Sequence, residues 1–195
     1  MAHFRPAIVL VILFTLLTGL ALPLGFVAGA RVTATSAANG SLVEREGKVV
    51  GSSLIGQEFK DANYFHGRPS ATTDTDPADS TKTVPAPYNA SNSGASNLGA
   101  TSKALIDRVT ADAKDAGPAP IPGDQLTTSA SGLDPDISPE NAARQVAAVA
   151  TARNLPMDRV QQLVTANTSG RLLGVIGEPR VNVLALNLAL DAAAR

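Results

Sequence analysis

The longest apolar segment of the chain lies near its amino terminus. Residues 7–30 contain no charged side chain, and fourteen of these 24 residues are Leu, Ile, Val or Phe. An α-helix rises about 1.5 Å per residue, so this segment would be roughly 36 Å long, which exceeds the hydrocarbon core of about 30 Å in a bilayer. The pattern therefore predicts one helix that is long enough to cross a membrane.

A cleavable signal peptide is the competing interpretation of this segment. Residues 28–30 read Ala-Gly-Ala, which has the small-x-small form of a cleavage site. However, the apolar region of a cleaved signal is typically about 7–15 residues long, and the run here is longer. We therefore expect a retained anchor, with a tail over 1–6, a transmembrane helix over 7–30 and a linker over 31–41.

The charges that flank the segment predict its orientation. The amino terminus and Arg5 precede it, and Arg31 alone follows it closely. Because positively charged flanks tend to remain cytoplasmic, we expect a cytoplasmic amino terminus and an extracytoplasmic domain over 42–195. The expected fold class is a single N-terminal transmembrane helix plus one mixed α/β (α+β) extracytoplasmic domain.

Small residues recur at four-residue spacing inside the predicted span. Ala21, Gly25 and Gly29 share one helical face, and Thr18 lies near it. Such a face lets a second helix approach closely, which would make it a docking surface. Glycine and alanine are also simply common in membrane helices, and the span alone leaves both interpretations open. Pro23 predicts a kink because it removes one backbone donor.

The rest of the chain has patterns of short strands and helices. A strand pair is expected within 44–55, with a turn at Glu46-Gly47. Ser138, Pro139 and Glu140 form a helix start that should continue to Arg153. The other expected features are an aromatic core of Phe59, Tyr64 and Phe65, a helix from Pro156 with Met157, Val160, Leu163 and Val164 buried, and a strand near Val181 to Leu186 before a short terminal helix.

Two polar stretches have ambiguous patterns. Residues 70–97 are rich in Thr, Asp, Ser, Asn and Pro, so they predict a long loop, and Asp74, Asp76 and Asp79 within it lack the glycine and glutamate of a calcium loop. Residues 94–101 have the glycine spacing of a phosphate loop without its lysine. We interpret them as a helix cap, with Asn97 or Thr101 preceding the helix through 104–109.

Composition excludes several classes of function. The chain has 16 basic and 17 acidic residues, so its surface is not the basic one that nucleic acids require. It has no cysteine and two histidines, which excludes disulfide scaffolds and sites built from several thiolates or imidazoles. Hydrolase motifs are absent, and a triad of His66 with Ser129 or Ser131 is disfavoured. We expect no catalysis by the chain itself, no metal site and no nucleic-acid partner.

Residues 127–132 form a run of Ser, Thr, Ala and Gly before Leu133-Asp134-Pro135. Its hydroxyls could bind an anion or a partner backbone, or they could satisfy amides of their own turn. The sequence leaves both open.

Several motifs in order resemble one family, the C subunit (KdpC) of the bacterial Kdp potassium-pumping ATPase. The resemblance covers nearly the whole chain, with Ala100 in place of an expected proline and Thr128 in place of an expected alanine. The residues that carry it are the apolar span, Gly51-Ser52-Ser53-Leu54-Ile55-Gly56-Gln57, Tyr64-Phe65-His66-Gly67-Arg68-Pro69-Ser70-Ala71-Thr72, Ser96-Asn97-Leu98-Gly99, Ser131-Gly132-Leu133-Asp134-Pro135 and the ending from Gly177 to Asp191.

The resemblance implies a non-catalytic accessory subunit in a bacterial inner membrane. Its expected partners are the channel-like potassium-binding subunit (KdpA), the P-type ATPase subunit (KdpB) and membrane lipid. The family is described as a catalytic chaperone that raises ATP affinity, so no cofactor is expected to bind tightly and ATP would act through the ATPase subunit. The alternative is direct ATP contact by 127–132. Candidate partner- or nucleotide-binding residues are Arg68, Ser70, Ser96, Asn97, Gly99, Ser129, Ser131, Gly132 and Asp134.

Overall fold

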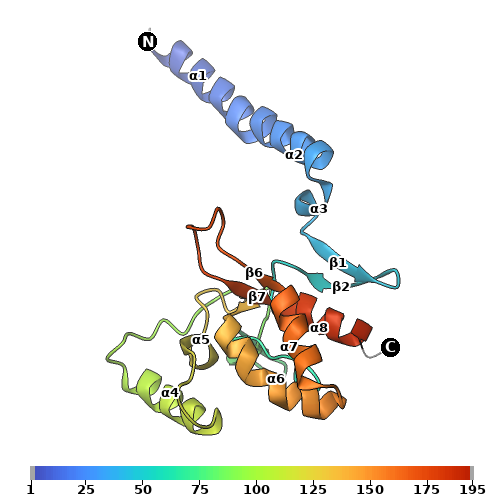
Figure 1. Cartoon of the computed structure of the whole chain (residues 1–195). Coiled ribbons are helices and arrows are strands. Elements are labelled where there is room, and N and C mark those ends of the chain that lie inside the picture. The colour runs from blue at the N-terminus through green and yellow to red at the C-terminus, as the bar shows by residue number, and fades with distance from the viewer. Residues whose placement is uncertain (1–2, 194–195) are drawn as a thin grey trace. The chain divides into compact units, whose positions relative to one another are not determined.

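The computed structural model describes residues 3–193, and the chain divides into two compact units, Met1–Ser52 and Ser53–Arg195. The first unit begins with a helix that runs without a break from Phe4 to Thr33 and has a mean hydropathy of 2.6. It consists of α1 (Phe4–Leu16), a π-helical turn η1 (Leu17–Ala21) and α2 (Leu22–Thr33) (Figure 1). No side chain in its most apolar window is buried. The structure thus confirms one apolar N-terminal helix that is long enough to cross a membrane.

Pro23 affects this helix through the turn that precedes it. Proline has no N–H group to donate to the carbonyl four residues earlier, at Gly19. The chain forms a wider turn there, in which the Leu22 N–H donates to the Leu17 carbonyl, and the α-helix resumes with Pro23 in its first turn. A π-turn of this kind is a common way for a helix to absorb such a mismatch.

A helical turn and a hairpin complete the first unit. The expected linker contains α3 (Thr35–Ala38), and β1 (Leu42–Arg45) then pairs antiparallel with β2 (Lys48–Ser52). Glu46 and Gly47 connect the strands with φ values of 53° and 75°, as a tight hairpin turn requires. The predicted strand pair and its turn are therefore confirmed, although β2 ends at Ser52.

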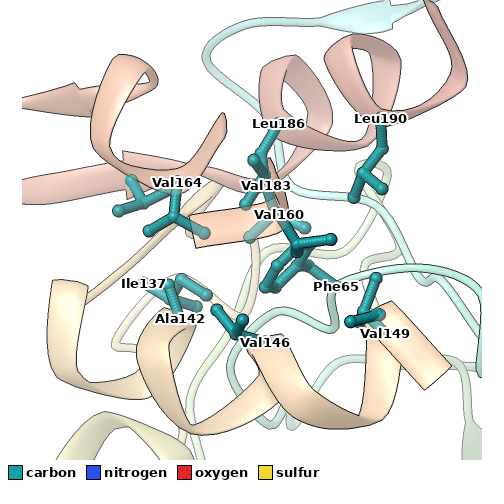
Figure 2. Packing of buried hydrophobic residues seen from close by; sticks show 12 residues of the cluster. Phe65, Ile137, Ala142, Val146, Val149, Val160, Val164, Val183, Leu186 and Leu190 are labelled. Atoms are coloured by element: carbon teal, nitrogen blue, oxygen red, sulfur yellow. The ribbon is translucent and has the colours of Figure 1, made fainter. Parts of the chain in front are cut away.

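The second unit has a core of three helices and a small antiparallel sheet. The helices are α6 (Pro139–Arg153), α7 (Met157–Ala166) and α8 (Val183–Ala193), and the sheet has the order β5 (Asp136–Ile137), β7 (Arg180–Asn182), β6 (Thr168–Ser169). Figure 2 shows Phe65 lying among side chains of all three helices. The core cluster comprises Phe65, Ile137, Ala142, Val146, Val149, Ala150, Val160, Val164, Val181, Val183, Leu186 and Leu190.

The predicted start of α6 is confirmed. The Ser138 hydroxyl accepts a hydrogen bond from the Asn141 N–H at 3.0 Å, which makes Ser138 the N-cap, and Pro139 occupies the first helical position. The helix ends at Arg153, where Asn154 takes a left-handed conformation with φ of 53°. In α7, Val160 and Val164 are buried as predicted, but Met157 is 56% exposed because it lies in the first turn, and the prediction that it is buried is wrong.

The carboxyl-terminal strand is shorter than predicted. β7 ends at Asn182, and Val183 to Leu186 already belong to α8. The Asn182 side-chain oxygen accepts a hydrogen bond from the Ala185 N–H at 3.0 Å, which caps the helix at this point. The β-branched Val183 and its neighbours are apolar enough for either element, and the buried spacing of Leu186 and Leu190 fits a helix.

The polar stretch over 70–97 contains a hairpin that its composition did not predict. β3 (Thr73–Asp76) pairs antiparallel with β4 (Asp79–Pro85). The aspartates stabilise the turn, since Asp76 accepts from the Ala78 N–H and Asp79 accepts from the Thr81 N–H. The expectation of a loop without secondary structure is wrong because β-branched threonines and an Asx turn form a hairpin that needs no core.

Two helices follow this hairpin in the chain, before the core helix α6. They are α4 (Lys103–Asp115) and α5 (Gly123–Leu126). The N-cap residue of α4 is Ser102, whose backbone is extended, and not Asn97 or Thr101. The predicted cap was therefore wrong by one residue from Thr101. Asn97 has φ of 52° and belongs to the preceding turn.

Candidate functional site

Two of the sequence motifs that lie far apart in the chain meet through Arg68 and Asp134. The Arg68 Nη1 atom donates to Asp134 Oδ2 at 2.8 Å, and both side chains are about one quarter exposed, at 24% and 30%. Arg68 Nη2 also lies 3.4 Å from the Thr128 carbonyl. The ion pair therefore joins the segment after Phe65 to the Ser/Thr/Gly run.

Side chains of α6 and α8 hold the segment that leads to Arg68. Asn187 accepts a hydrogen bond from the Phe65 N–H at 2.8 Å and donates to the Phe65 carbonyl at 2.9 Å. Gln145 does the same for His66, at 2.8 and 3.1 Å. Both backbone groups of Phe65 and of His66 are thereby satisfied without a strand partner, which is how buried backbone is tolerated away from a sheet.

The Arg153 side chain anchors the beginning of the same segment. Its Nε donates to the Asn63 carbonyl at 2.6 Å, and its Nη2 donates to Asp191 at 2.8 Å. The guanidinium carbon also lies 4.6 Å from the centre of the Tyr64 ring, in cation–π geometry. The aromatic group expected in the core is thus confirmed, with Phe65 fully buried and Phe59 packed against the cluster.

Ser70 and Gly132 form the second contact between the two motifs. The Ser70 hydroxyl donates to the Gly132 carbonyl at 2.8 Å and lies 3.0 Å from the Thr72 hydroxyl, which itself donates to the Ala86 carbonyl at 2.6 Å. Gly132 has φ of 68°, and a β-carbon there would contact the Thr72 methyl group and lie 2.7 Å from the Gly94 carbonyl. Only glycine fits this position.

Tyr88 closes the site from the other side. Its hydroxyl donates to the Arg68 carbonyl at 2.6 Å, and its N–H donates to the Ser70 hydroxyl at 3.0 Å. A β-carbon at Gly56 would overlap the Tyr88 ring, and one at Gly67 would overlap the Tyr88 hydroxyl. Burial, and then the negative charge of Asp134, raise the pKa of Tyr88 to about 12.

Sequence reasoning did not select Tyr88 or Thr72. The available signal was Gly67 in the motif Tyr64-Phe65-His66-Gly67-Arg68, since glycine allows another side chain to pack directly against its backbone.

Arg68 lines three neighbouring pockets of the second unit, with volumes of about 340, 370 and 530 Å³. Its Nε atom is buried without a hydrogen-bond partner among residues 3–193. The smallest of the three pockets is lined by charged residues of both signs, including Asp124, Asp136 and Arg180. The Arg68 guanidinium therefore holds the segment after Phe65 against the Ser/Thr/Gly run.

The acidic groups of this pocket respond to different surroundings. Burial opposes ionisation of Asp124, but hydrogen bonds from the Ser138 N–H, the Asn141 amide and the Ser138 hydroxyl outweigh it, so its pKa is lowered. Burial raises the pKa of Asp136, and a hydrogen bond from Asn182 and the charge of Arg180, 3.0 Å away, only partly offset it.

Among the described residues, no cluster of three or more His, Asp or Glu side chains forms a metal site.

The Ser/Thr/Gly run makes its hydrogen bonds within the chain. The Ser131 hydroxyl accepts from the Leu133 N–H at 3.1 Å, and the Thr127 hydroxyl donates to the Gly123 carbonyl at 2.7 Å. The Ser131 carbonyl accepts from the Gly94 N–H and the Ser93 hydroxyl. The Thr127 and Ser131 hydroxyls thus bond within local turns, whereas the Ser131 carbonyl joins the run to the distant Ser93-Gly94 segment; the interpretation that the run binds an anion or a partner stays a prediction.

The remaining candidate residues lie in different surroundings. Ser129 is buried, at 5% exposure, and lines the 530 Å³ pocket together with Arg68 and Asp134. Asn97 and Gly99 are exposed in the connection before α4, with Ser96 partly buried beside them. Thr18 donates to the Phe14 carbonyl within the apolar helix, and around Gly25 and Gly29 no atom lies within 4 Å of an added β-carbon. The structure brings together the candidates Arg68, Ser70, Ser129, Ser131, Gly132 and Asp134.

Among residues 3–193, neither Ser129 nor Ser131 is hydrogen-bonded to the His66 ring. The His66 Nε2 atom lies 3.3 Å from the Asp61 carbonyl, and the Ser131 hydroxyl is engaged with Leu133. A triad would need the serine and histidine within hydrogen-bond distance of each other. The cluster therefore has the properties of a rigid joint and not of a reaction centre.

The chain is similar to known proteins over nearly its whole length. Residues 4–192 match the family model described as "KdpC: K+-transporting ATPase, c chain". Proteins named potassium-transporting ATPase KdpC subunit are similar over nearly their whole length. The one from Bradyrhizobium diazoefficiens is 63% identical, covering 98% of each chain, and the one from Methylobacterium nodulans is 62% identical, covering 97% of this chain and 96% of its own. That from Methylorubrum populi is 58% identical, covering 100% and 99%.

Proposed function

Since the chain belongs to the KdpC family, and is thus a non-catalytic subunit of the K+-transporting ATPase complex, we propose that it works as a membrane-anchored assembly subunit of this pump. The apolar helix holds the chain in the bilayer, and the second unit lies on the extracytoplasmic side. The observation that carries the proposal is the helix from Phe4 to Thr33, which is uncharged over 7–30 and unburied within the chain.

The helix provides a surface for a partner in the membrane. Around Gly25 and Gly29 the space is open, so another helix could approach their backbone closely. Apolar side chains gain little from leaving lipid, and close packing at small residues is therefore what favours association. We assign this face, with Ala21 beside it, to the channel-like subunit KdpA. Any effect of this chain on KdpB, the ATPase subunit, would then be transmitted through the complex.

Exchange of the two glycines tests the docking face. Gly25→Leu with Gly29→Leu should strongly reduce co-purification of KdpA with the tagged full chain. Gly19→Leu is the matched control, because it adds the same side chain to the same helix away from this face, and it should leave co-purification unchanged. Full assembly of the double variant would contradict docking through this face.

The orientation can be tested by labelling, because the chain has no cysteine. Ala78→Cys, in the exposed turn between β3 and β4, should react with a membrane-impermeant maleimide in right-side-out vesicles. His3→Cys, on the amino-terminal flank, should react only after permeabilisation. The reverse pattern would place the second unit in the cytoplasm.

An effect on ATP affinity fits this proposal only as coupling through the pump. ATP binds on the cytoplasmic side, whereas the second unit is proposed to lie outside. Within 127–132 the Thr127 hydroxyl donates to the Gly123 carbonyl, whereas the Ser131 hydroxyl accepts from the Leu133 N–H and keeps its own O–H, so direct nucleotide binding stays the alternative that binding measurements test. Coupling is reciprocal, so ATP should tighten binding of this chain to the pump by the factor by which the chain tightens ATP binding.

Binding of ATP to the isolated full chain in detergent separates the two mechanisms. We expect no saturable binding by the chain alone and a lower ATP KM for the pump when the chain is present. Saturable binding that is lost in Ser131→Ala would favour direct contact.

A further inference from the structure

The pocket beside the Ser/Thr/Gly run combines apolar surface with charged groups of both signs. Its volume is about 530 Å³, and small-molecule sites typically have volumes of about 300–1,000 Å³. Leu54 and Pro135 contribute apolar surface to it, and its polar lining comes from Arg68, Ser129, Ser131 and Asp134. All of these residues belong to the second unit. The pocket is therefore large enough and chemically varied enough to bind a small molecule.

Ser129 is the buried polar residue of this pocket. It is only 5% exposed, yet neither its hydroxyl nor its N–H makes a hydrogen bond within residues 3–193. Buried donors are nearly always paired, because an unpaired one has lost its hydrogen bonds to water without replacing them. Since Ser129 lines the pocket, an acceptor bound there would satisfy donors that the fold leaves unpaired.

Two further groups of the pocket have donors that the chain does not fully use. The Ser131 hydroxyl accepts from the Leu133 N–H, and its own O–H has no acceptor within residues 3–193. The Arg68 Nη1 atom donates to Asp134 at 2.8 Å, but Nη2 makes only long contacts of 3.4 and 3.5 Å with the Thr128 and Thr127 carbonyls. The pocket thus has an excess of donors, and the positive charge of Arg68 favours a carboxylate as the acceptor.

Asp134 determines the net charge that the pocket can accept. Its carboxylate lines the same pocket, where it pairs with Arg68. Residues 53–195 also contain twelve Lys and Arg against fifteen Asp and Glu, a net charge of −3. Asp134 and the whole unit would repel a ligand with net negative charge, whereas a ligand that carries an ammonium group beside its carboxylate matches both charges of the pocket.

We propose that this pocket binds a zwitterionic aliphatic α-amino acid. The ligand carboxylate accepts hydrogen bonds from Ser129, Ser131 and Arg68, its ammonium group donates to Asp134, and its side chain packs against Leu54 and Pro135. This ligand site goes beyond the proposed function and does not depend on the side of the membrane on which the second unit lies. Because the ligand contacts both motifs that Arg68 and Asp134 join, its binding stabilises the folded unit.

Calorimetric titration of the full chain in detergent with L-leucine tests the proposal. The matched ligands are 4-methylpentanoate, which lacks the ammonium group, and 3-methylbutylamine, which lacks the carboxylate. We expect saturable binding of leucine, a Kd for each matched ligand that is roughly tenfold higher or more, and no competition by ATP. Absence of saturable leucine binding, equal binding of either matched ligand, or displacement of leucine by ATP would overturn the proposal.

Ser129→Ala separates ligand binding from a structural role of the hydroxyl. Removing an unpaired buried hydroxyl should leave the melting temperature of the ligand-free chain unchanged or slightly higher, whereas the Kd for leucine should rise roughly fivefold or more. Ser80→Ala, at an exposed serine of β4, is the matched control and should change neither quantity. A lower melting temperature with an unchanged Kd for leucine would make the hydroxyl structural and would contradict the site.

Asp134→Asn tests the ammonium position separately. The amide keeps the shape of the carboxylate but removes its charge, so the difference in Kd between leucine and 4-methylpentanoate should shrink to roughly twofold or less. A tenfold difference that persists in this variant would contradict binding of the ammonium group by Asp134.

Discussion

Arg68 and Asp134, 66 positions apart in the sequence, form an ion pair of 2.8 Å that joins the two most distinctive motifs of the second unit. Arg68→Ala would leave the partly buried Asp134 carboxylate without its cation and the Thr128 carbonyl without its nearest donor. Loss of such a pair costs about 1–3 kcal/mol. Thermal unfolding of the full chain in detergent should show a melting temperature lower by several degrees.

The matched control for this change is Lys103→Ala. Lys103 pairs with Asp107 on the surface of α4, where the two side chains are 86% and 60% exposed. An exposed pair contributes about 0–1 kcal/mol, so its melting temperature should hardly change. Equal effects of the two variants would argue against a clamp at Arg68.

Gly132→Ala should destabilise the second unit strongly. The left-handed conformation at φ of 68° disfavours alanine, and its β-carbon would overlap the Thr72 methyl group and approach the Gly94 carbonyl. Together these effects amount to about 2–4 kcal/mol. Denaturant unfolding measures the loss.

Gly99→Ala is the corresponding control. No atom lies within 4 Å of an added β-carbon at this position, and no positive φ is recorded there. The stability should change by less than about 0.5 kcal/mol or rise slightly. A loss at Gly99 as large as at Gly132 would mean that the close approach to Thr72 is not the cause.

Asn187→Leu should destabilise the core although it adds apolar volume. Asn187 is 2% exposed, and its amide satisfies both backbone groups of Phe65. Leucine would leave that N–H and that carbonyl buried without partners, at about 1–3 kcal/mol each. Hydrogen exchange of the Phe65 amide should become faster, and Ala185→Leu, on the exposed side of α8, should not change it.

Alkaline pH should weaken the joint through Tyr88. Burial and the charge of Asp134 raise its pKa from 10.0 to about 12, so folding favours the protonated phenol. The stability from this group is complete below pH 10 and is lost as the pH rises through 12. In the Tyr64→Phe variant Tyr88 is the sole tyrosine, and its absorbance at 295 nm should titrate near 12 in the folded chain.

A titration midpoint near 10 in the folded chain would contradict this assignment. Tyr88→Phe removes the 2.6 Å hydrogen bond to the Arg68 carbonyl together with the titrating group. It should lower stability at neutral pH and flatten the dependence of stability on pH between 10 and 12.

Local sequence signals predicted the elements whose ends are determined locally. The apolar run located the long helix, and Ser138-Pro139 located the start of α6 because an N-cap needs only its own turn. The boundary between β7 and α8 was missed, since it depends on the Asn182 side chain competing with strand pairing. The hairpin after Ser70 was missed because cross-strand pairing between polar residues leaves no apolar alternation.

The candidate site was predicted in part, for a related reason. Arg68, Ser70, Gly132 and Asp134 were selected through motifs, and the structure brings them together. Tyr88 was not selected, because its role depends on two glycines that are distant in sequence and close in space. The ordered motifs could identify the residues, whereas their pairing required the fold.

The π-turn at Leu17–Ala21 means that the membrane helix carries one surplus residue relative to a regular α-helix. Each residue rotates the helix by about 100°, so the stripes of side chains before and after this turn are offset by roughly that angle. A neighbouring helix that packs along Gly25 and Gly29 therefore does not meet the same stripe of side chains in α1. The amino-terminal half of the helix therefore presents a different face from the half that contains Gly25 and Gly29.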